Sequence, residues 1–207
     1  MLCRTRIFID YWNYQLSWND RMGRDATGSR VGCDWTALPA ALAGAAGRVL
    51  AGVGLTGVPQ VEETLLYASV DPATETRLRG WLTSTVDRMP SYRVTIRERR
   101  PQRRPVHCRS CGADTERCPA CGDVLRARVE KGVDAQLVTD MLTLAWHDAY
   151  DLAILVTSDA DFVPAVQRIQ ERGLKVVNAA WRSKGHDLKA ACWASFDLDE
   201  IAKTICR

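Results

Sequence analysis

The chain has 207 residues, of which 46% are hydrophobic and 26% are charged, and its formal net charge is +3. This composition excludes a largely disordered chain, because it supplies enough apolar side chains for the core of one domain with a small insert. No apolar run approaches the roughly 20 residues that a membrane helix needs. The short apolar run that ends at Asp10 indicates a strand rather than a signal peptide, so we expect a cytoplasmic protein without a membrane partner.

Predicted strands and helices alternate along the first half of the chain, which is the pattern of a parallel sheet covered by helices. The first of these helices starts near Asp34, a residue type that is common at N-caps. The last of these strands alternates apolar with basic side chains, so we expect it to expose one basic face. In chain order the sequence predicts a strand at 4–10, a loop at 19–32, a helix at 34–49, a strand at 64–70, a helix at 73–89 and a strand at 92–97.

The alternation stops at a basic stretch with two prolines, residues 99–105, which leads into four cysteines. Regular structure then resumes, with an interruption near Ser195 in the last helical segment. The sequence predicts a helix at 132–146, a strand at 152–157, a helix at 161–172, a strand at 174–179 and a helical segment at 187–205. We therefore expect one α/β domain, residues 1–98 and 129–207, with a basic linker and cysteine insert at 99–128.

Carboxylates follow the ends of two predicted strands. Asp10 closes the first strand, and Asp159 and Asp161 follow the strand at 152–157. Open α/β sheets bind ligands beyond the carboxyl ends of their strands, where two close carboxylates repel each other by about 4 kcal/mol at an effective dielectric near 20. Mg²⁺ or Mn²⁺ relieves such repulsion and prefers oxygen ligands. One of the two later acids could simply cap the next helix, but the turn offers two acids and two hydroxyls, which favours metal-dependent chemistry on an anionic substrate.

Two more acids lie on the predicted helix at 132–146. At 100° per residue, Asp134 falls inside the apolar stripe of this helix and Asp140 lies at its edge. A carboxylate on a buried face costs several kcal/mol unless it is paired or bound to a metal. The alternative is that Asp134 only complements the helix dipole in the first turn. We favour a functional role for both residues.

These motifs together resemble the NYN domain family of PIN-like ribonucleases. The residues that carry the resemblance are Asp10-x-x-Asn13, Lys131-Gly132-Val133-Asp134 with Asp140, Ser158-Asp159-Ala160-Asp161-Phe162-Val163-Pro164 and Ala194-Ser195-Phe196-Asp197-Leu198. The resemblance spans nearly the whole chain apart from the cysteine insert. It implies a Rossmann-like, PIN-like three-layer α/β/α domain with a central, mostly parallel sheet. It also implies an acidic site that cleaves RNA with the help of Mg²⁺ or Mn²⁺.

The resemblance also implies roles for individual residues by position. The metal-binding acids would be Asp10, Asp134 and Asp159. The residues that support the metal, its waters or the scissile phosphate would be Asn13, Asp140 and Asp161. Asp161 also counts among the candidate metal ligands, and all six are candidate catalytic residues. The family's turn commonly reads Ser-Gly-Asp-Ser-Asp, whereas this chain has Ser158 and Ala160 in place of the Gly and the second Ser.

The insert contains two C-x-x-C pairs, each followed by a glycine that suits a knuckle turn. The four thiols are Cys108, Cys111, Cys118 and Cys121. Tetrahedral Zn²⁺ with four sulfur ligands is the expected occupant of a small zinc ribbon or knuckle. Two disulfides are the alternative, which we disfavour for a reducing compartment. Four sulfurs close the coordination shell, so the zinc would be structural.

Charge is concentrated around the insert, because residues 93–131 carry eleven Arg or Lys against five Asp or Glu. A basic appendage on an acidic body suggests a polyanionic partner, and with the resemblance we expect RNA, single-stranded in our interpretation. The arginines predicted to contact its phosphates are Arg97, Arg99, Arg100, Arg103 and Arg104. A solvated loop whose arginines only maintain solubility is the alternative. The sequence also leaves a homodimer open.

Two other functions compete with a metal-dependent ribonuclease. A catalytically silent RNA-binding or adaptor module on the same fold would usually lose an acid, and the intact acidic set argues against it. A phosphotransferase of the haloacid dehalogenase type is suggested by the motif at 159–163. That family's motif normally follows the first strand and needs a downstream Lys and an acidic pair, whereas fewer than 50 residues follow Asp159. The ribonuclease is therefore our leading hypothesis.

Overall fold

The computed structural model describes residues 2–103, 105–107, 111–129 and 131–207. Its centre is a six-stranded sheet in the order β3-β2-β1-β8-β9-β10, and all neighbouring strands run parallel. The strands are β1 (Leu2–Asp10), β2 (Val58–Val70), β3 (Tyr92–Glu98), β8 (Leu152–Val156), β9 (Lys175–Ala180) and β10 (Ala194–Asp197). Strand order reverses between β1 and β8, and ligands bind at such a switch point in open α/β sheets. The predicted α/β fold is confirmed.

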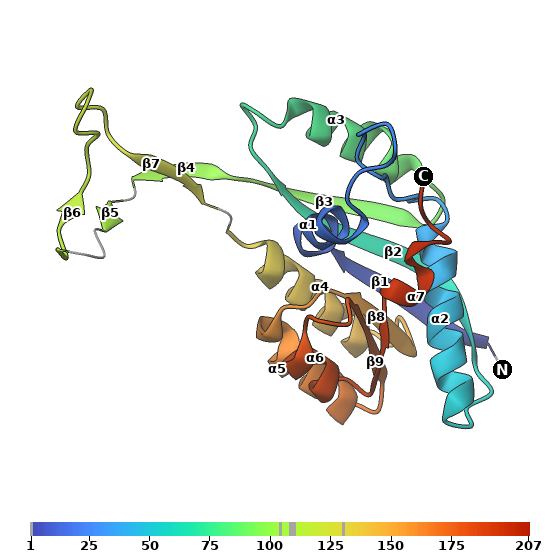
Figure 1. The fold of residues 1–207 in the computed structure, drawn as a ribbon. Coiled ribbons are helices and arrows are strands. Elements are labelled where there is room, and N and C mark those ends of the chain that lie inside the picture. The colour runs from blue at the N-terminus through green and yellow to red at the C-terminus, as the bar shows by residue number, and fades with distance from the viewer. Residues whose placement is uncertain (1, 104, 108–110, 130) are drawn as a thin grey trace.

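Helices cover both faces of the sheet and give three layers (Figure 1). One face carries α1 (Tyr11–Met22), α2 (Leu38–Gly52), α3 (Thr76–Ser84), the short helix η1 (Val86–Arg88) and α7 (Asp199–Ala202). The other face carries α4 (Val133–Trp146), the short helix η2 (Ala160–Phe162), α5 (Val163–Glu171) and α6 (His186–Ala191). Successive side chains of a strand point to opposite faces, so Ile7 and Ile9 pack in the first core and Phe8 packs in the second.

Two predicted helices differ from the structure. Asp34 does accept hydrogen bonds, from the amides of Thr36 and Ala37, but it caps a turn and α2 begins only at Leu38. The predicted helical segment at 187–205 is instead α6, the edge strand β10 and α7. The physical reason is that Leu188 packs in the core on one face of the sheet and Phe196 in the core on the other. A single helix lies on one face of the sheet and cannot bury both side chains. The chain therefore passes from one face to the other through the edge strand β10.

The insert forms a two-stranded arm that continues from β3 and extends away from the body (Figure 1). At the base of the arm, β4 (Arg100–Arg103) pairs with β7 (Arg126–Val129). At its tip, β5 (Val106–His107) pairs with β6 (Asp114–Thr115). Both pairs are antiparallel. The sequence predicted a basic linker with two prolines ahead of the cysteine insert, and it did not predict the strand pair of β4 and β7. None of the helices in the described part of the chain has the length and apolarity that a membrane span requires.

Candidate active site

Asp10 occupies the switch point of the sheet. It is the last residue of β1 and caps α1, because its Oδ1 accepts the amide of Asn13 at 3.2 Å. Its Oδ2 accepts the hydroxyl of Thr157, which follows β8, at 3.2 Å. With only 9% of its surface exposed, Asp10 is held in one orientation by donors from two elements. The sequence predicted its place but not its contact with Thr157.

The turn after β8 is hydrogen-bonded to α1, and it also has hydrogen bonds within itself that involve Asp159 and Asp161. The side-chain oxygen of Asn13 accepts both the amide and the hydroxyl of Ser158 at 3.0 Å. The amide of Asp159 donates to the hydroxyl oxygen of Thr157 at 3.3 Å, and Oδ1 of Asp159 accepts the amide of Asp161 at 2.9 Å. Asp159 is half-buried and Asp161 is exposed. The structure therefore brings Asp10, Asn13 and Asp159 together, with Asp161 at the outer side of the turn.

A buried asparagine supports this turn from the neighbouring strand. Asn178, on β9, is fully buried and donates to the carbonyl oxygens of Leu155 and Thr157 at 3.0 and 2.9 Å. These two bonds fix the end of β8 and with it the Thr157 hydroxyl. No motif in the sequence contains Asn178. The signal in the sequence is its amide side chain, which stands among apolar residues of the strand. Buried polar groups have hydrogen-bond partners, so such a residue indicates a structural contact.

Asp134 does not lie on the buried face of α4, and that prediction is wrong. The buried side chains of this helix recur every four residues, at Val133, Leu137, Met141 and Ala145. The buried stripe is therefore narrow, and the next residue after Val133 is rotated by about 100° out of it. Asp134 is exposed in the first turn, at the end of α4 that faces the carboxyl edge of the sheet. Its proposed metal role rests on this position and not on burial.

Asp140 is half-buried and receives two hydrogen bonds. The Tyr67 hydroxyl donates to its Oδ2 at 2.8 Å, and the Gln136 amide donates to its Oδ1 at 2.9 Å. Tyr67 stands beside Asp10 in the register of β1 and β2. Burial and the bond to Asp140 raise the pKa of Tyr67, so its hydroxyl stays protonated and remains a donor. Arg97 on β3 donates in turn to the Gln136 side chain, so Asp140 links α4 to the sheet.

The donor chemistry of this edge suits a hard divalent cation. Asp10 and Asp159 offer carboxylate oxygens, and neutral donors already orient both: the Asn13 amide and the Thr157 hydroxyl for Asp10, and the Asp161 amide for Asp159. Within the described residues, no three His, Cys, Asp or Glu side chains are grouped closely enough to form a preassembled ion site. The fit is therefore one of ligand type, because oxygen donors are those that Mg²⁺ and Mn²⁺ prefer.

The arginines predicted to contact RNA fall into different environments. Arg99 is half-buried: its guanidinium donates to the side chain and the carbonyl of Ser69 at 2.9 and 3.2 Å and lies 4.8 Å from the centre of the Trp12 ring. It is also 3.4 Å from Glu75. Arg97 and Arg100 are exposed. Arg103 lies on β4, and Arg104 falls outside the described residues.

Cys111, Cys118 and Cys121 lie at or next to turns whose backbone suits thiolate ligands. Gly112 and Gly122 have φ of 73° and 74°, the left-handed region that glycine adopts without strain. The N–H groups of Cys121 and Ala120 are directed at the Cys118 thiol and lower its pKa. Cys111, Cys118 and Cys121 are not in disulfides, whereas Cys108 lies outside the described residues. Zinc binding remains a prediction.

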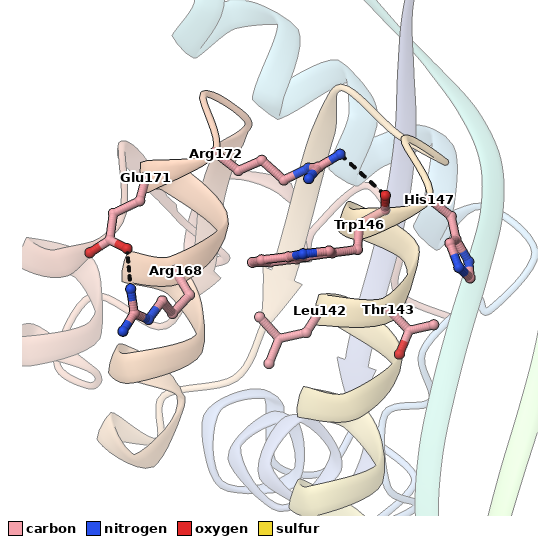
Figure 2. A pocket seen from close by; sticks show the side chains of 7 residues that line it. All are labelled: Leu142, Thr143, Trp146, His147, Arg168, Glu171 and Arg172. Carbon is pink, nitrogen blue, oxygen red and sulfur yellow. Dashed lines mark hydrogen bonds and ion pairs between the residues drawn. The ribbon is translucent and has the colours of Figure 1, made fainter.

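A cavity of about 710 Å³ lies between the far ends of α4 and α5 and contains none of the predicted site residues. Figure 2 shows the Trp146 ring between Leu142 and Arg172, with Arg168 and Glu171 across the gap. Asp134 lies in the first turn of α4 and Trp146 ends the helix, so these two residues are about 18 Å apart along its axis. The cavity begins at Leu142, beyond Asp140, and is lined by none of the predicted acids.

Comparison with known proteins agrees with the fold. Residues 87–199, more than half of the chain, match the family model of the NYN domain. A protein of unknown function from Vibrio parahaemolyticus RIMD 2210633 superposes with a TM-score of 0.54 and 18% identity, over 96% of this chain and 94% of that one, a likeness of fold alone. A structure concerned with the mechanism and regulation of Sir2 enzymes has 12% identity and a TM-score of 0.39 over 97% and 90% of the two chains, too low to carry an argument. No curated protein matches the sequence.

Proposed function

This chain belongs to the NYN domain family, whose members are nucleases of the ribonuclease type, and we propose that it is an Mg²⁺- or Mn²⁺-dependent ribonuclease. The proposed reaction is hydrolysis of RNA phosphodiester bonds at the edge where β1 and β8 end. The observation that carries the proposal is the hydrogen-bonded chain from Asp10 through Thr157 to Asp159. It ties the Asp10 carboxylate to the backbone amide of Asp159 at the switch point of the sheet, where α/β domains bind ligands.

The proposed roles follow from the contacts of each side chain. Asp10 and Asp159 would hold the cation, with Asp134 and Asp161 contributing from the exposed sides of the site. When bound, a divalent cation supplies an activated water and neutralises charge on the phosphate. Asn13 keeps the turn after β8 against α1 through its two bonds from Ser158. Because Asp140 on α4 accepts the hydroxyl of Tyr67 on β2, its proposed role is to position α4 against the sheet.

The proposed RNA contacts lie on the arm. Its base strands carry four arginines, at the two ends of β4 and within β7: Arg100, Arg103, Arg126 and Arg128. In the antiparallel register Arg103 stands opposite Arg126. Lysine and arginine contacts to phosphates give affinity without much sequence preference. Zinc held by the four cysteines would organise the tip, which has too few apolar residues for a core of its own.

The direct test is incubation of the purified protein with end-labelled single-stranded RNA in Mg²⁺, in Mn²⁺ and in chelator. We expect cleavage with metal, none in chelator, and recovery when Mg²⁺ or Mn²⁺ is restored without zinc. Binding of RNA without cleavage under every metal condition would identify a silent RNA-binding module instead. Release of phosphate from a small phosphoester, with RNA left intact, would support a phosphotransferase.

A further inference from the structure

The loop after β9 presses against the proposed catalytic turn. Gly185 ends this loop with a φ of 71°, and a Cβ at this position would lie 3.1 Å from the Cα of Ser158. At such a separation Ser158 would have to move by a few tenths of an ångström, so both the left-handed conformation and the close approach favour glycine here. The residue before it, Lys184, is therefore held next to this turn.

The Lys184 ammonium points to α1, the helix that Asp10 caps and that contains Asn13. Its Nζ donates to the hydroxyl of Ser17 on α1 at 2.9 Å. Ser17 lies one turn beyond Asn13, about 6 Å along the helix axis, and seven residues beyond Asp10, about 10 Å along the axis. The positive charge is thus near the acidic edge but too far along α1 to replace a cation between Asp10 and Asp159.

Three cations from α1 and from the segment after β9 have carboxylate partners. Arg182 and Lys189 both pair with Asp197, at 3.0 and 2.8 Å, and Arg21 pairs with Asp199. Among the residues that the structure describes, Lys184 makes no such ion pair, and its hydrogen-bond partner is a neutral hydroxyl. An exposed ammonium whose partner is a neutral hydroxyl remains able to form a charge-assisted bond to an anion that approaches from outside.

We propose that Lys184 binds a backbone phosphate of the RNA, next to the scissile one and on the β9 side of the acidic residues. This inference rests on the ribonuclease function proposed above. Strand order places the arm, which follows β3, on the opposite flank of β1 and β8. The RNA strand would therefore be held on both sides of the cleaved bond. Lysine suits this role as a point charge for phosphate, without the fixed geometry of arginine.

The test compares Lys184→Gln and Lys184→Arg with Lys203→Gln, a change of an exposed lysine near the C-terminus that serves as the control. With Mn²⁺ present, Lys184→Gln should raise KM for single-stranded RNA about tenfold, the effect of one lost hydrogen bond to a charged group, and leave kcat unchanged. The dependence of log K on log salt should flatten by roughly 0.7. Lys184→Arg should keep the salt slope of the original protein, and so should Lys203→Gln.

An active Lys184→Gln variant with unchanged KM and salt slope would overturn this inference and leave the ribonuclease function intact. Failure of the original protein to bind or cleave RNA would overturn both. A second measurement needs no change at Lys184: acetylation of lysines in Asp159→Asn protein with and without intact RNA. RNA should protect Lys184 and leave Lys203 equally reactive, and equal acetylation of Lys184 in both samples would contradict the proposal.

Discussion

The hydroxyl of Thr157 donates to a carboxylate oxygen of Asp10 at 3.2 Å and so joins the carboxyl ends of β8 and β1. The hydroxyl oxygen of Thr157 also accepts the backbone amide of Asp159 at 3.3 Å. One side chain therefore ties the Asp10 carboxylate to the backbone at Asp159, a residue distant from it in sequence. At their other ends the two strands are joined by Arg4 and Asp151, whose side chains meet at 2.7 Å. The site is thus built on strands that are held at both ends.

The bond between Tyr67 and Asp140 predicts a positioning role for the tyrosine. Tyr67→Phe should lower the free energy of unfolding by about 1.5–3 kcal/mol, the usual worth of a hydrogen bond to a charged group, and should reduce kcat because α4 is held less firmly. Tyr150→Phe is the matched control, since that buried hydroxyl donates to the carbonyl of Met141 at 2.9 Å. It should lose stability but keep kcat in RNA cleavage. Equal kcat values for the two variants would refute a role of Tyr67 in the site.

Arg99 and Arg100 are adjacent but should behave differently when changed to Gln. Arg99→Gln should lower the free energy of unfolding in urea by about 1–2 kcal/mol, because it removes bonds to Ser69 and a cation–π contact with Trp12. Arg100→Gln, at an exposed residue, should leave stability unchanged. Combined with Arg103→Gln and Arg104→Gln, it should instead weaken binding of unrelated RNAs alike and flatten the salt slope by roughly 0.7 per lost contact. Unchanged stability in Arg99→Gln would show that its guanidinium is not engaged as the structure has it.

Replacement of Cys108 and Cys111 by Ser should release one zinc ion per chain, because two thiolate ligands are lost. We expect weaker RNA affinity with the six-stranded sheet still folded, since the arm has its own strand pairs outside that sheet. Elemental analysis measures the zinc content, a binding assay measures the RNA affinity, and circular dichroism shows whether the sheet is folded. Cys3→Ser, outside the insert, is the control. Protein purified without chelator that contains no zinc would exclude the structural zinc.

The pair formed by Arg4 and Asp151 predicts a pH-dependent contribution to stability. The hydrogen bond from Arg4 holds the pKa of Asp151 below its usual value. A depressed carboxyl pKa adds stability that is complete above the unfolded-state value of about 4 and is lost as pH falls through the folded-state value. Asp151→Asn should therefore lower the free energy of unfolding at pH 7, by up to about 1 kcal/mol for so exposed a pair.

Urea unfolding of Asp151→Asn and the original protein at pH 7 and near pH 3 checks this difference. The gap between the two proteins should shrink at the lower pH. Asp20→Asn, at an exposed residue of α1, should show no gap at either pH. A gap in Asp151→Asn that grows with acid would reverse the sign of the argument.

The sequence predicted those parts of the site that depend on local pattern. Asp10 and Asp159 follow apolar runs, and the carboxyl ends of neighbouring parallel strands meet at one edge, so their proximity could be expected. The exposure of Asp134 could not, because the helical pattern does not show how wide a stripe of α4 the sheet covers. The buried residues turn out to recur every fourth position.

Contacts between segments that are far apart in the chain could not be predicted from the sequence. The bond between Tyr67 and Asp140 spans 73 residues and depends on β2 lying beside β1. The bond between Lys184 and Ser17 spans 167 residues and depends on the loop after β9 reaching α1. Neither Tyr67 nor Lys184 belongs to a short motif. A single sequence shows which residues follow a strand but not which strand becomes its neighbour.

The most direct test of the central claim is the rate of single-stranded RNA cleavage in Mn²⁺ by Asp134→Asn and Asp159→Asn, with Asp20→Asn as the control. Each of the first two should lose more than about a hundredfold in rate, because metal stabilisation of the transition state is worth several kcal/mol. Their unfolding free energies should change little, since Asp134 is exposed and an amide oxygen at position 159 can still accept the Asp161 amide. Asp20→Asn should cleave at the original rate. Near-original cleavage by either site variant, in protein shown to be folded, would contradict the account.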